Sequence, residues 1–146
     1  MTDPFDLQRF LDEQAAVYAR VLAELRRGQK QSHWMWFIFP QLGGLGHSAM
    51  AQRFAIASRE EAVAYLGHGV LGLRLKECTA LITAVEGRTV HEILGSPDDL
   101  KFQSSMTLFS AVSSDPEFSA AIGKFYDGRP DQRTLDLLIS GGTRLA

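Results

Sequence analysis

The chain has 146 residues, of which 45% are hydrophobic and 22% charged, and this composition excludes a disordered or fibrous protein. Its 15 Lys and Arg against 17 Asp and Glu give a net charge of -2, without the basic excess of a general nucleic-acid-binding protein. A chain of this length buries roughly two thirds of its unfolded surface, so we expect one compact domain over residues 1–146.

The first predicted helix covers about residues 4–27. Asp3 is placed to accept hydrogen bonds from free amides as the N-cap, and Pro4 suits the first helical position because its missing N–H costs nothing there. Asp6 favours the positive end of the helix dipole, and Gly28 supplies the stop. Apolar residues recur on one face at Leu7, Phe10, Leu11, Tyr18, Val21, Leu22 and Leu25.

Capping signals and glycines predict seven further helices. The starts are marked by hydroxyl–carboxylate pairs at capping-box spacing or by a cap followed by proline, at Ser58–Glu61, Thr89–Glu92, Ser96–Pro97 and Asp115–Pro116. Glycines able to adopt a left-handed conformation mark the ends, at Gly67, Gly87, Gly95 and Gly128. The predicted ranges are about 48–57, 59–67, 70–86, 90–94, 97–113, 116–126 and 131–140. The fold class is therefore all-α, with residues 34–39 as the only stretch of strand character.

The aromatic segment, residues 32–41 from Ser32 to Gln41, contains both tryptophans, Trp34 and Trp36. It is too apolar to remain in water, since each buried aromatic ring removes roughly 150–250 Å² from solvent. In one interpretation the segment runs through the core and the helices surround it. In the other, some of its rings line a ligand pocket with polar residues at the mouth, namely His33, Gln41 and His47.

A glycine-rich loop, residues 42–47, follows directly. It lacks the lysine and serine of a P-loop, so it does not indicate a nucleotide by itself. Its glycines permit positive φ and the close approach of a ligand. The amides at the start of the helix near Ser48 form a generic anion site.

The helix predicted over residues 97–113 places Lys101, Ser104 and Ser105 on one face. A lysine beside a hydroxyl can bind an anion, or deprotonate a serine nucleophile if the lysine is desolvated. The same pattern is common on ordinary helix faces, where hydroxyls bond back to the preceding turn. All three interpretations remain open from the sequence.

The remaining candidate groups favour structural roles. The histidines lack the i, i+4 spacing of a helical metal pair and the single Cys78 has no cysteine partner, so we expect no metal site and no cofactor. Cys78 lies in an amphipathic run and is predicted to be a small buried hydrophobe. His68 follows a predicted helix end and should be stabilised by that C-terminus, whereas His91 should face solvent.

Three stretches of the chain resemble the bacterial family known as domain of unknown function 1810: Asp3-Pro4-Phe5-Asp6-Leu7; residues 32–41 with Gly44-Leu45-Gly46; and Asp98-Asp99-Leu100-Lys101 with Ser104-Ser105-Met106-Thr107-Leu108-Phe109. The resemblance spans nearly the whole chain and implies a single all-helical domain without an established activity. Some members carry the label of calpastatin, whose long, disordered and charged chain differs from this composition.

Two functions of different classes are compatible with these residues. The first is the binding of a small metabolite that bears a phosphate or a nucleotide, by a binding domain or an enzyme, in a pocket between residues 32–41 and the helix of residues 101–107. The second is a protein-interaction module that uses the aromatic segment and the glycine-rich loop. The start of the chain has no secretion signal, and its longest apolar stretch, residues 34–39, is too short to cross a membrane, so we expect a soluble cytoplasmic protein.

Overall fold

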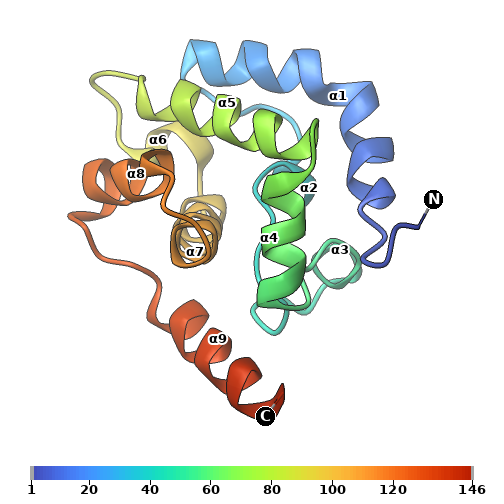
Figure 1. The fold of residues 1–146 in the computed structure, drawn as a ribbon. Coiled ribbons are helices and arrows are strands. Elements are labelled where there is room, and N and C mark those ends of the chain that lie inside the picture. Colours follow the sequence, from blue (N-terminus) through green and yellow to red (C-terminus); the bar gives the residue numbers. More distant parts are fainter. Residues whose placement is uncertain (1, 146) are drawn as a thin grey trace.

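The computed structural model describes residues 2–145, with side chains to residue 140, and over these residues the chain forms nine helices (Figure 1). The extended pairing in this range is a single bridge between Leu42 and Ile56, which confirms the all-α prediction. The helices are α1 (Gln8–Arg27), α2 (Met35–Ile38), α3 (Ala49–Arg53), α4 (Arg59–Gly67), α5 (Leu71–Thr83), α6 (Val90–Leu94), α7 (Asp98–Ala111), α8 (Pro116–Tyr126) and α9 (Gln132–Leu145).

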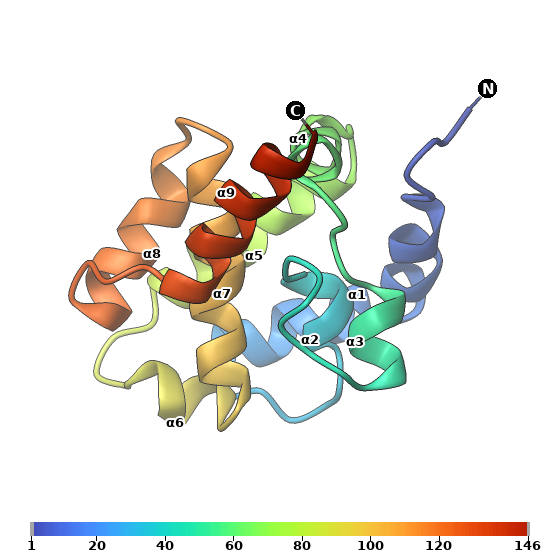
Figure 2. The same cartoon turned by 90° about the horizontal axis from the view of Figure 1, so that it is seen from below.

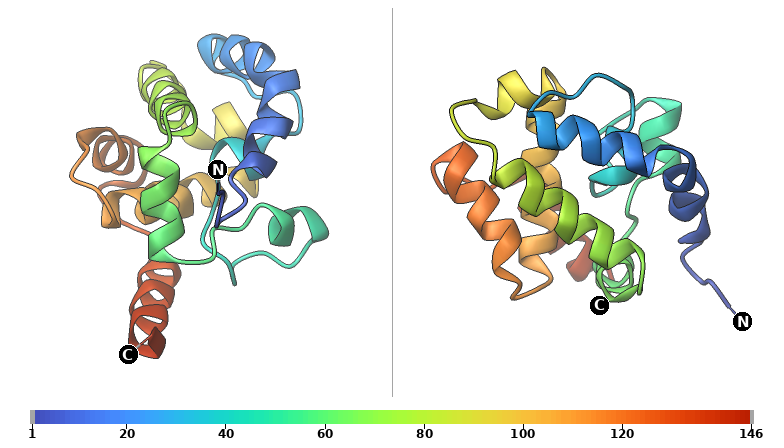
Figure 3. Two further views of the ribbon diagram at one scale, coloured as in Figure 1. Left: turned by 45° about the vertical axis from the view of Figure 1, so that its right-hand side comes forward. Right: turned by 90° about the horizontal axis from the view of Figure 1, so that it is seen from above.

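Helix α7 occupies the centre of the fold and contacts α4, α6, α8 and α9 (Figures 1 and 2). On one side α1 and α5 run next to each other, and the short α2 packs against both (Figure 3). Helix α9 lies against α7 at its start, while its C-terminal end extends away from the other helices. None of the helices in residues 2–145 is long and apolar enough to cross a lipid bilayer.

A line of aromatic rings in edge-to-face and tilted contacts joins four of these helices through the core. The ring centre of Tyr65 on α4 lies 5.0 Å from that of Phe10 on α1 and 5.6 Å from that of Phe109 on α7. Phe109 in turn lies 5.8 Å from Phe118 on α8. All four side chains are fully buried, so the apolar stripes of helices distant in sequence meet in one hydrophobic cluster.

The N-terminal helix starts four residues later than predicted. The carboxylate of Asp3 does cap free amides, but it accepts from Leu7 at 2.8 Å and from Gln8 at 2.9 Å. Asp6, which lies between Asp3 and these amides, has a φ of 51°, a left-handed conformation that interrupts the helix. Pro4, Phe5 and Leu7 therefore lie in turns, and Pro4 is not the first helical residue.

Two predicted capping pairs bind as expected at the hydroxyl. Thr89 and Glu92 form the complete capping box, and the hydroxyl of Ser58 accepts from the amide of Glu61 at 3.1 Å. The Glu61 carboxylate, however, accepts from Ala57 at 2.9 Å and not from Ser58. Ser58 and Glu61 thus form only half of a capping box, because the Glu61 carboxylate binds the amide of Ala57.

One other predicted cap is wrong and another is correct in position only. Ser96 does not cap α7; Pro97 precedes the helix, and the Ser96–Pro97 peptide is cis. Asp115 is the N-cap residue of α8, but its carboxylate makes no capping hydrogen bond and pairs with Lys76 at 3.1 Å. Pro116 nevertheless occupies the first helical position as expected.

The corner between α4 and α5 also differs from the prediction. Gly67 is the last residue of α4 and is not left-handed. The Nδ1 atom of His68 accepts from the amides of Val70 at 3.1 Å and Leu71 at 3.2 Å, so it caps the start of α5 rather than the end of α4. A Cβ on Gly72 would lie 2.0 Å from the carbonyl oxygen of Leu66, so only glycine permits this tight corner.

Candidate functional site

The aromatic segment forms one helical turn, α2, inside the core. Its apolar side chains are buried, with Trp34 only 1% exposed and Phe37 4%. Trp36 is the exception, since it is half-buried and lies at the edge of the cluster. The structural interpretation is therefore confirmed for most of the segment, and Trp36 is the ring that remains for contact with a ligand or a partner.

Glu24 on α1 anchors the beginning of the segment. Its buried carboxylate accepts from the amides of Gln31 at 2.8 Å and Ser32 at 3.1 Å, from the Ser32 hydroxyl at 2.6 Å and from the Trp34 indole at 2.9 Å. Desolvation opposes ionisation, but the hydrogen bonds from Ser32, Gln31 and Trp34 outweigh it and lower the pKa of Glu24 to about 2. The segment is thus tied to an ionised side chain.

Gln14 on the same helix anchors the end of α2. Its amide nitrogen donates to the carbonyl of Phe37 at 2.7 Å and to the hydroxyl of Tyr65 at 3.1 Å, and its amide oxygen accepts from Arg74 at 3.3 Å. Sequence reasoning did not identify Gln14 or Glu24 as positioning residues. The signal was available, because both are polar residues on the apolar face of α1, and a buried polar side chain requires a specific partner.

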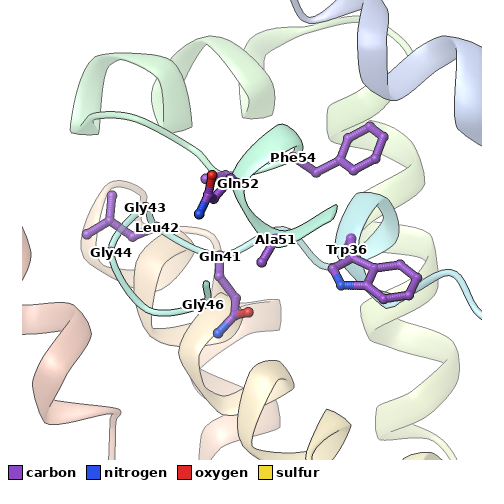
Figure 4. Close-up of a pocket in the computed structure, with 10 residues that line it drawn as sticks. Trp36, Gln41, Leu42, Gly43, Gly44, Gly46, Ala51, Gln52 and Phe54 are labelled. Carbon is purple, nitrogen blue, oxygen red and sulfur yellow. The ribbon is translucent and has the colours of Figure 1, made fainter. Parts of the chain in front are cut away.

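A cavity of about 220 Å³ opens next to Trp36. Its walls come from α2, the glycine-rich loop and α3 with the residues that follow it: Trp36, Gln41, Leu42, Gly43, Gly44, Gly46, Ala51, Gln52, Phe54 and Ala55 (Figure 4). Two of the predicted site residues, Trp36 and Gln41, thus line one pocket. The second wall expected from the helix of residues 101–107 is formed instead by the glycine-rich loop and α3.

The indole nitrogen of Trp36 has no hydrogen-bond acceptor among the described residues, although the atom is buried. In Figure 4 it lies on the edge of the ring that faces Gln41 and Ala51, both of which line the pocket. An unpaired buried donor costs about 1–3 kcal/mol of stability. The fold therefore keeps an unsatisfied N–H group in the wall of a pocket.

The glycine-rich loop is held in place in its first half by hydrogen bonds. The amide of Gly43 donates to the carbonyl of Ile56, and the amide of Ile56 donates to the carbonyl of Gln41, each at 2.8 Å. Gly44 has a φ of +98°, and its carbonyl accepts from Arg133 of α9 at 3.3 Å. The backbone of Gly43 and Gly44, fixed by these hydrogen bonds, thus forms part of the pocket wall.

The anion site predicted at the helix near Ser48 is not formed. Helix α3 has only five residues, and the Ser48 hydroxyl accepts from the amide of Ala51 at 3.1 Å. His47, predicted at the pocket mouth, is exposed, and its carbonyl accepts from Gln52 at 3.0 Å. His33 is also exposed, before the start of α2, and neither histidine lines the pocket.

Lys101 of α7 lies close to the ring of Trp36. Its ammonium group is 5.4 Å from the centre of the Trp36 ring, and 3.8 Å from the carboxylate of Asp98. A second lysine, Lys30, pairs with the same carboxylate at 2.9 Å and lies 5.2 Å from the Trp34 ring. Lys101 is thus beside the pocket wall without lining the pocket.

The hydroxyls of α7 mainly fix α9. Ser104 shares a hydrogen bond of 3.0 Å with Thr134, and the hydroxyl of Thr107 accepts from the amide of Asp131 at 2.8 Å. The Asp131 carboxylate caps α9 by accepting from the amide of Thr134 at 3.1 Å. Ser105 is fully buried, and its hydroxyl has no partner among the described residues. Ser104 and Ser105 therefore do not line the pocket, contrary to the sequence-based hypothesis.

Other reactive groups are not arranged as a site. Within residues 2–145 there is no cluster of three or more His, Cys, Asp or Glu side chains that could bind a metal. Cys78 is fully buried, as predicted, and desolvation raises the pKa of its thiol to about 12. A second, more open hollow near the N-terminus contains Arg9, whose guanidinium is already engaged by Glu61 at 2.8 Å and by four backbone carbonyls.

Comparison with known proteins gives a consistent result. A family model described as "Protein of unknown function (DUF1810)" matches residues 4–138. The chain is similar to the crystal structure of the conserved hypothetical protein Rv1873 from Mycobacterium tuberculosis, with 55% sequence identity and a TM-score of 0.93. The match covers 94% of this chain and 99% of the other. No curated protein matches the chain.

Proposed function

The chain belongs to the DUF1810 family of proteins of unknown function, and we propose that it binds a small metabolite bearing a phosphate or a nucleotide in the pocket beside Trp36. The observation that carries the proposal is the buried indole N–H of Trp36, a residue that lines the pocket, because this N–H has no acceptor among the described residues. A ligand acceptor that completes this hydrogen bond recovers about 1–3 kcal/mol that the free protein forgoes.

The rigid support of the pocket favours recognition. Glu24 fixes the start of the aromatic segment, Gln14 fixes the end of α2 within it, and Arg133 contacts the glycine-rich loop. A site held in this way loses little conformational entropy when the ligand binds. Lys101 and Arg133 supply positive charge beside the walls, which suits a ligand with a phosphate group outside the pocket.

Binding rather than catalysis is the activity that the lining supports. The side chains of the pocket are those of Trp, Gln, Leu, Ala and Phe, together with glycine backbone. None of these types supplies a general base or a nucleophile at neutral pH.

As part of the same proposal, the protein acts in the bacterial cytoplasm, where nucleotides and sugar phosphates are abundant. The 55% identity to a bacterial protein supports the bacterial setting.

A thermal-shift screen of nucleotides, sugar phosphates and other metabolites tests the proposal. A ligand at 100 times its Kd adds about 2.7 kcal/mol to the stability of the folded state, which raises Tm by several degrees. The Trp36→Phe variant should lose most of this shift, because it keeps a ring but removes the N–H. The matched control is Tyr18→Phe, which removes a polar atom from an aromatic ring that bonds Glu77 on α5. A screen without any shift, or equal shifts in the wild type and Trp36→Phe, contradicts the proposal.

A further inference from the structure

The interior of the pocket is polar but uncharged. Its polar side chains are Trp36, Gln41 and Gln52, and none of its ten lining residues carries an ionisable side chain. An anion that enters a neutral pocket loses hydration without meeting a counter-charge, whereas a neutral polar group needs only hydrogen bonds. The part of the ligand that enters the pocket should therefore be neutral.

The pocket offers hydrogen-bond donors and acceptors together. The Trp36 indole is a donor only, while the side-chain amide of Gln41, unpaired within the described residues, supplies both a donor and an acceptor. The amide nitrogen of Gln52 is engaged by the carbonyl of His47, which leaves its oxygen as an acceptor. A carboxylate or phosphate presents acceptors alone, but the edge of a nucleobase alternates donors and acceptors that glutamine amides bind in pairs.

The size of the pocket suits a single ring system. Glycine backbone forms part of its lining, and at Gly46 this backbone lies directly against Ala51 of α3, since an added Cβ would come within 2.7 Å of the Cβ of Ala51. The volume of about 220 Å³ is below the roughly 300 Å³ at which pockets for drug-sized ligands begin. One heterocycle fits this space, and a dinucleotide does not.

From these three observations we infer that the ligand is a mononucleotide whose base enters the pocket edge-on. The base then forms hydrogen bonds with the indole of Trp36 and the amide of Gln41, while its sugar and phosphate stay outside, on the side of Lys101 and Arg133. This inference rests on the proposed function and names the ligand class of the same site. The net charge of -2 favours a free nucleotide over a nucleic-acid strand.

Isothermal titration calorimetry with matched probes tests the assignment. The probes are the four ribonucleosides, their 5′-monophosphates, ribose 5-phosphate, inorganic phosphate and a single-stranded RNA decamer. We expect at least one nucleoside to bind and its monophosphate to bind more tightly. Ribose 5-phosphate and phosphate should each bind at least about 10-fold more weakly than that monophosphate. The Gln41→Met variant should bind the monophosphate about 10-fold more weakly or worse. The Gln31→Met variant, on the exposed stretch before the segment, should leave the Kd of the monophosphate unchanged.

The outcomes separate this inference from the proposed function. Ribose 5-phosphate or phosphate binding as tightly as the monophosphate, or an unchanged Kd in Gln41→Met, overturns the base assignment while metabolite binding stands. Tighter binding of the decamer than of the monophosphate overturns the free-nucleotide assignment. Failure of every metabolite in the wider screen overturns the proposed function itself. If Gln41→Met does not fold, Trp36→Phe provides the same comparison, because it removes only the indole N–H and part of the ring.

Discussion

Replacement of Glu24 by glutamine should destabilise the protein by about 3 kcal/mol at pH 7. The folded protein lowers the pKa of this carboxylate from 4.5 to about 2, and each pKa unit corresponds to about 1.4 kcal/mol. The Gln side chain keeps the shape, but its NH₂ group then faces donors from Gln31, Ser32 or Trp34. Urea denaturation of the wild type and Glu24→Gln measures the difference in free energy of unfolding.

The effect has a defined pH dependence. Because the folded pKa lies below the unfolded value, the stabilisation is complete above about pH 5 and is lost as the pH falls towards 2. The gap between the wild type and Glu24→Gln should therefore narrow as denaturation is repeated from pH 7 down to pH 3. Glu86→Gln is the control, since Glu86 is 89% exposed and its replacement should change stability by less than about 0.5 kcal/mol. A gap below 1 kcal/mol at pH 7, or one that stays constant with pH, would refute the reasoning.

Three further predictions concern other parts of the fold. Gly72→Ala should cost about 3 kcal/mol of stability or prevent folding, because the added Cβ meets a backbone carbonyl. The control Gly123→Ala, in the open interior of α8, should be neutral or stabilising by up to about 1 kcal/mol. Equal melting temperatures for the two variants would contradict this prediction. Trp36→Phe should change the free energy of unfolding by less than about 1 kcal/mol, because removal of an N–H that has no acceptor among the described residues offsets the packing lost with the smaller ring. Trp34→Phe should lose about 1.5–3 kcal/mol with the hydrogen bond to the Glu24 carboxylate. Urea denaturation that ranks the two variants in the opposite order would be incompatible with the two hydrogen-bond assignments. Cys78 should resist iodoacetamide in the native protein and react after unfolding, because burial raises its pKa to about 12; modification of the native thiol at the rate of a free cysteine would show that it is accessible.

The helical class and most helix positions could be predicted from the sequence, because apolar periodicity and caps are local signals. The helices predicted at 59–67, 90–94 and 116–126 have the observed bounds. Two of the errors occur where a side chain binds an unexpected amide. Asp3 caps residues 7 and 8 across a left-handed Asp6, and His68 turns to the helix that follows it. Such choices depend on tertiary geometry that a sequence pattern does not contain.

The candidate site was predicted in part. The aromatic segment drew attention to Trp36 and Gln41, which do line the pocket. Ser104 was misplaced because helical spacing puts it on a face with Lys101 but does not reveal that α9 packs there and bonds its hydroxyl. Gln14 was missed because its partners, the carbonyl of Phe37 and the hydroxyl of Tyr65, are 23 and 51 residues away along the chain.

The indole N–H signals of the two tryptophans test metabolite binding at this pocket most directly. In a ¹H–¹⁵N NMR spectrum of the labelled protein, the Trp34 signal should report a hydrogen bond to Glu24, and Trp36→Phe assigns the other signal. Titration with the ribonucleoside monophosphate that binds most tightly in calorimetry should move the Trp36 signal downfield, because its N–H gains an acceptor, and leave the Trp34 signal nearly in place. A Trp36 signal that stays fixed at saturating ligand would contradict the account.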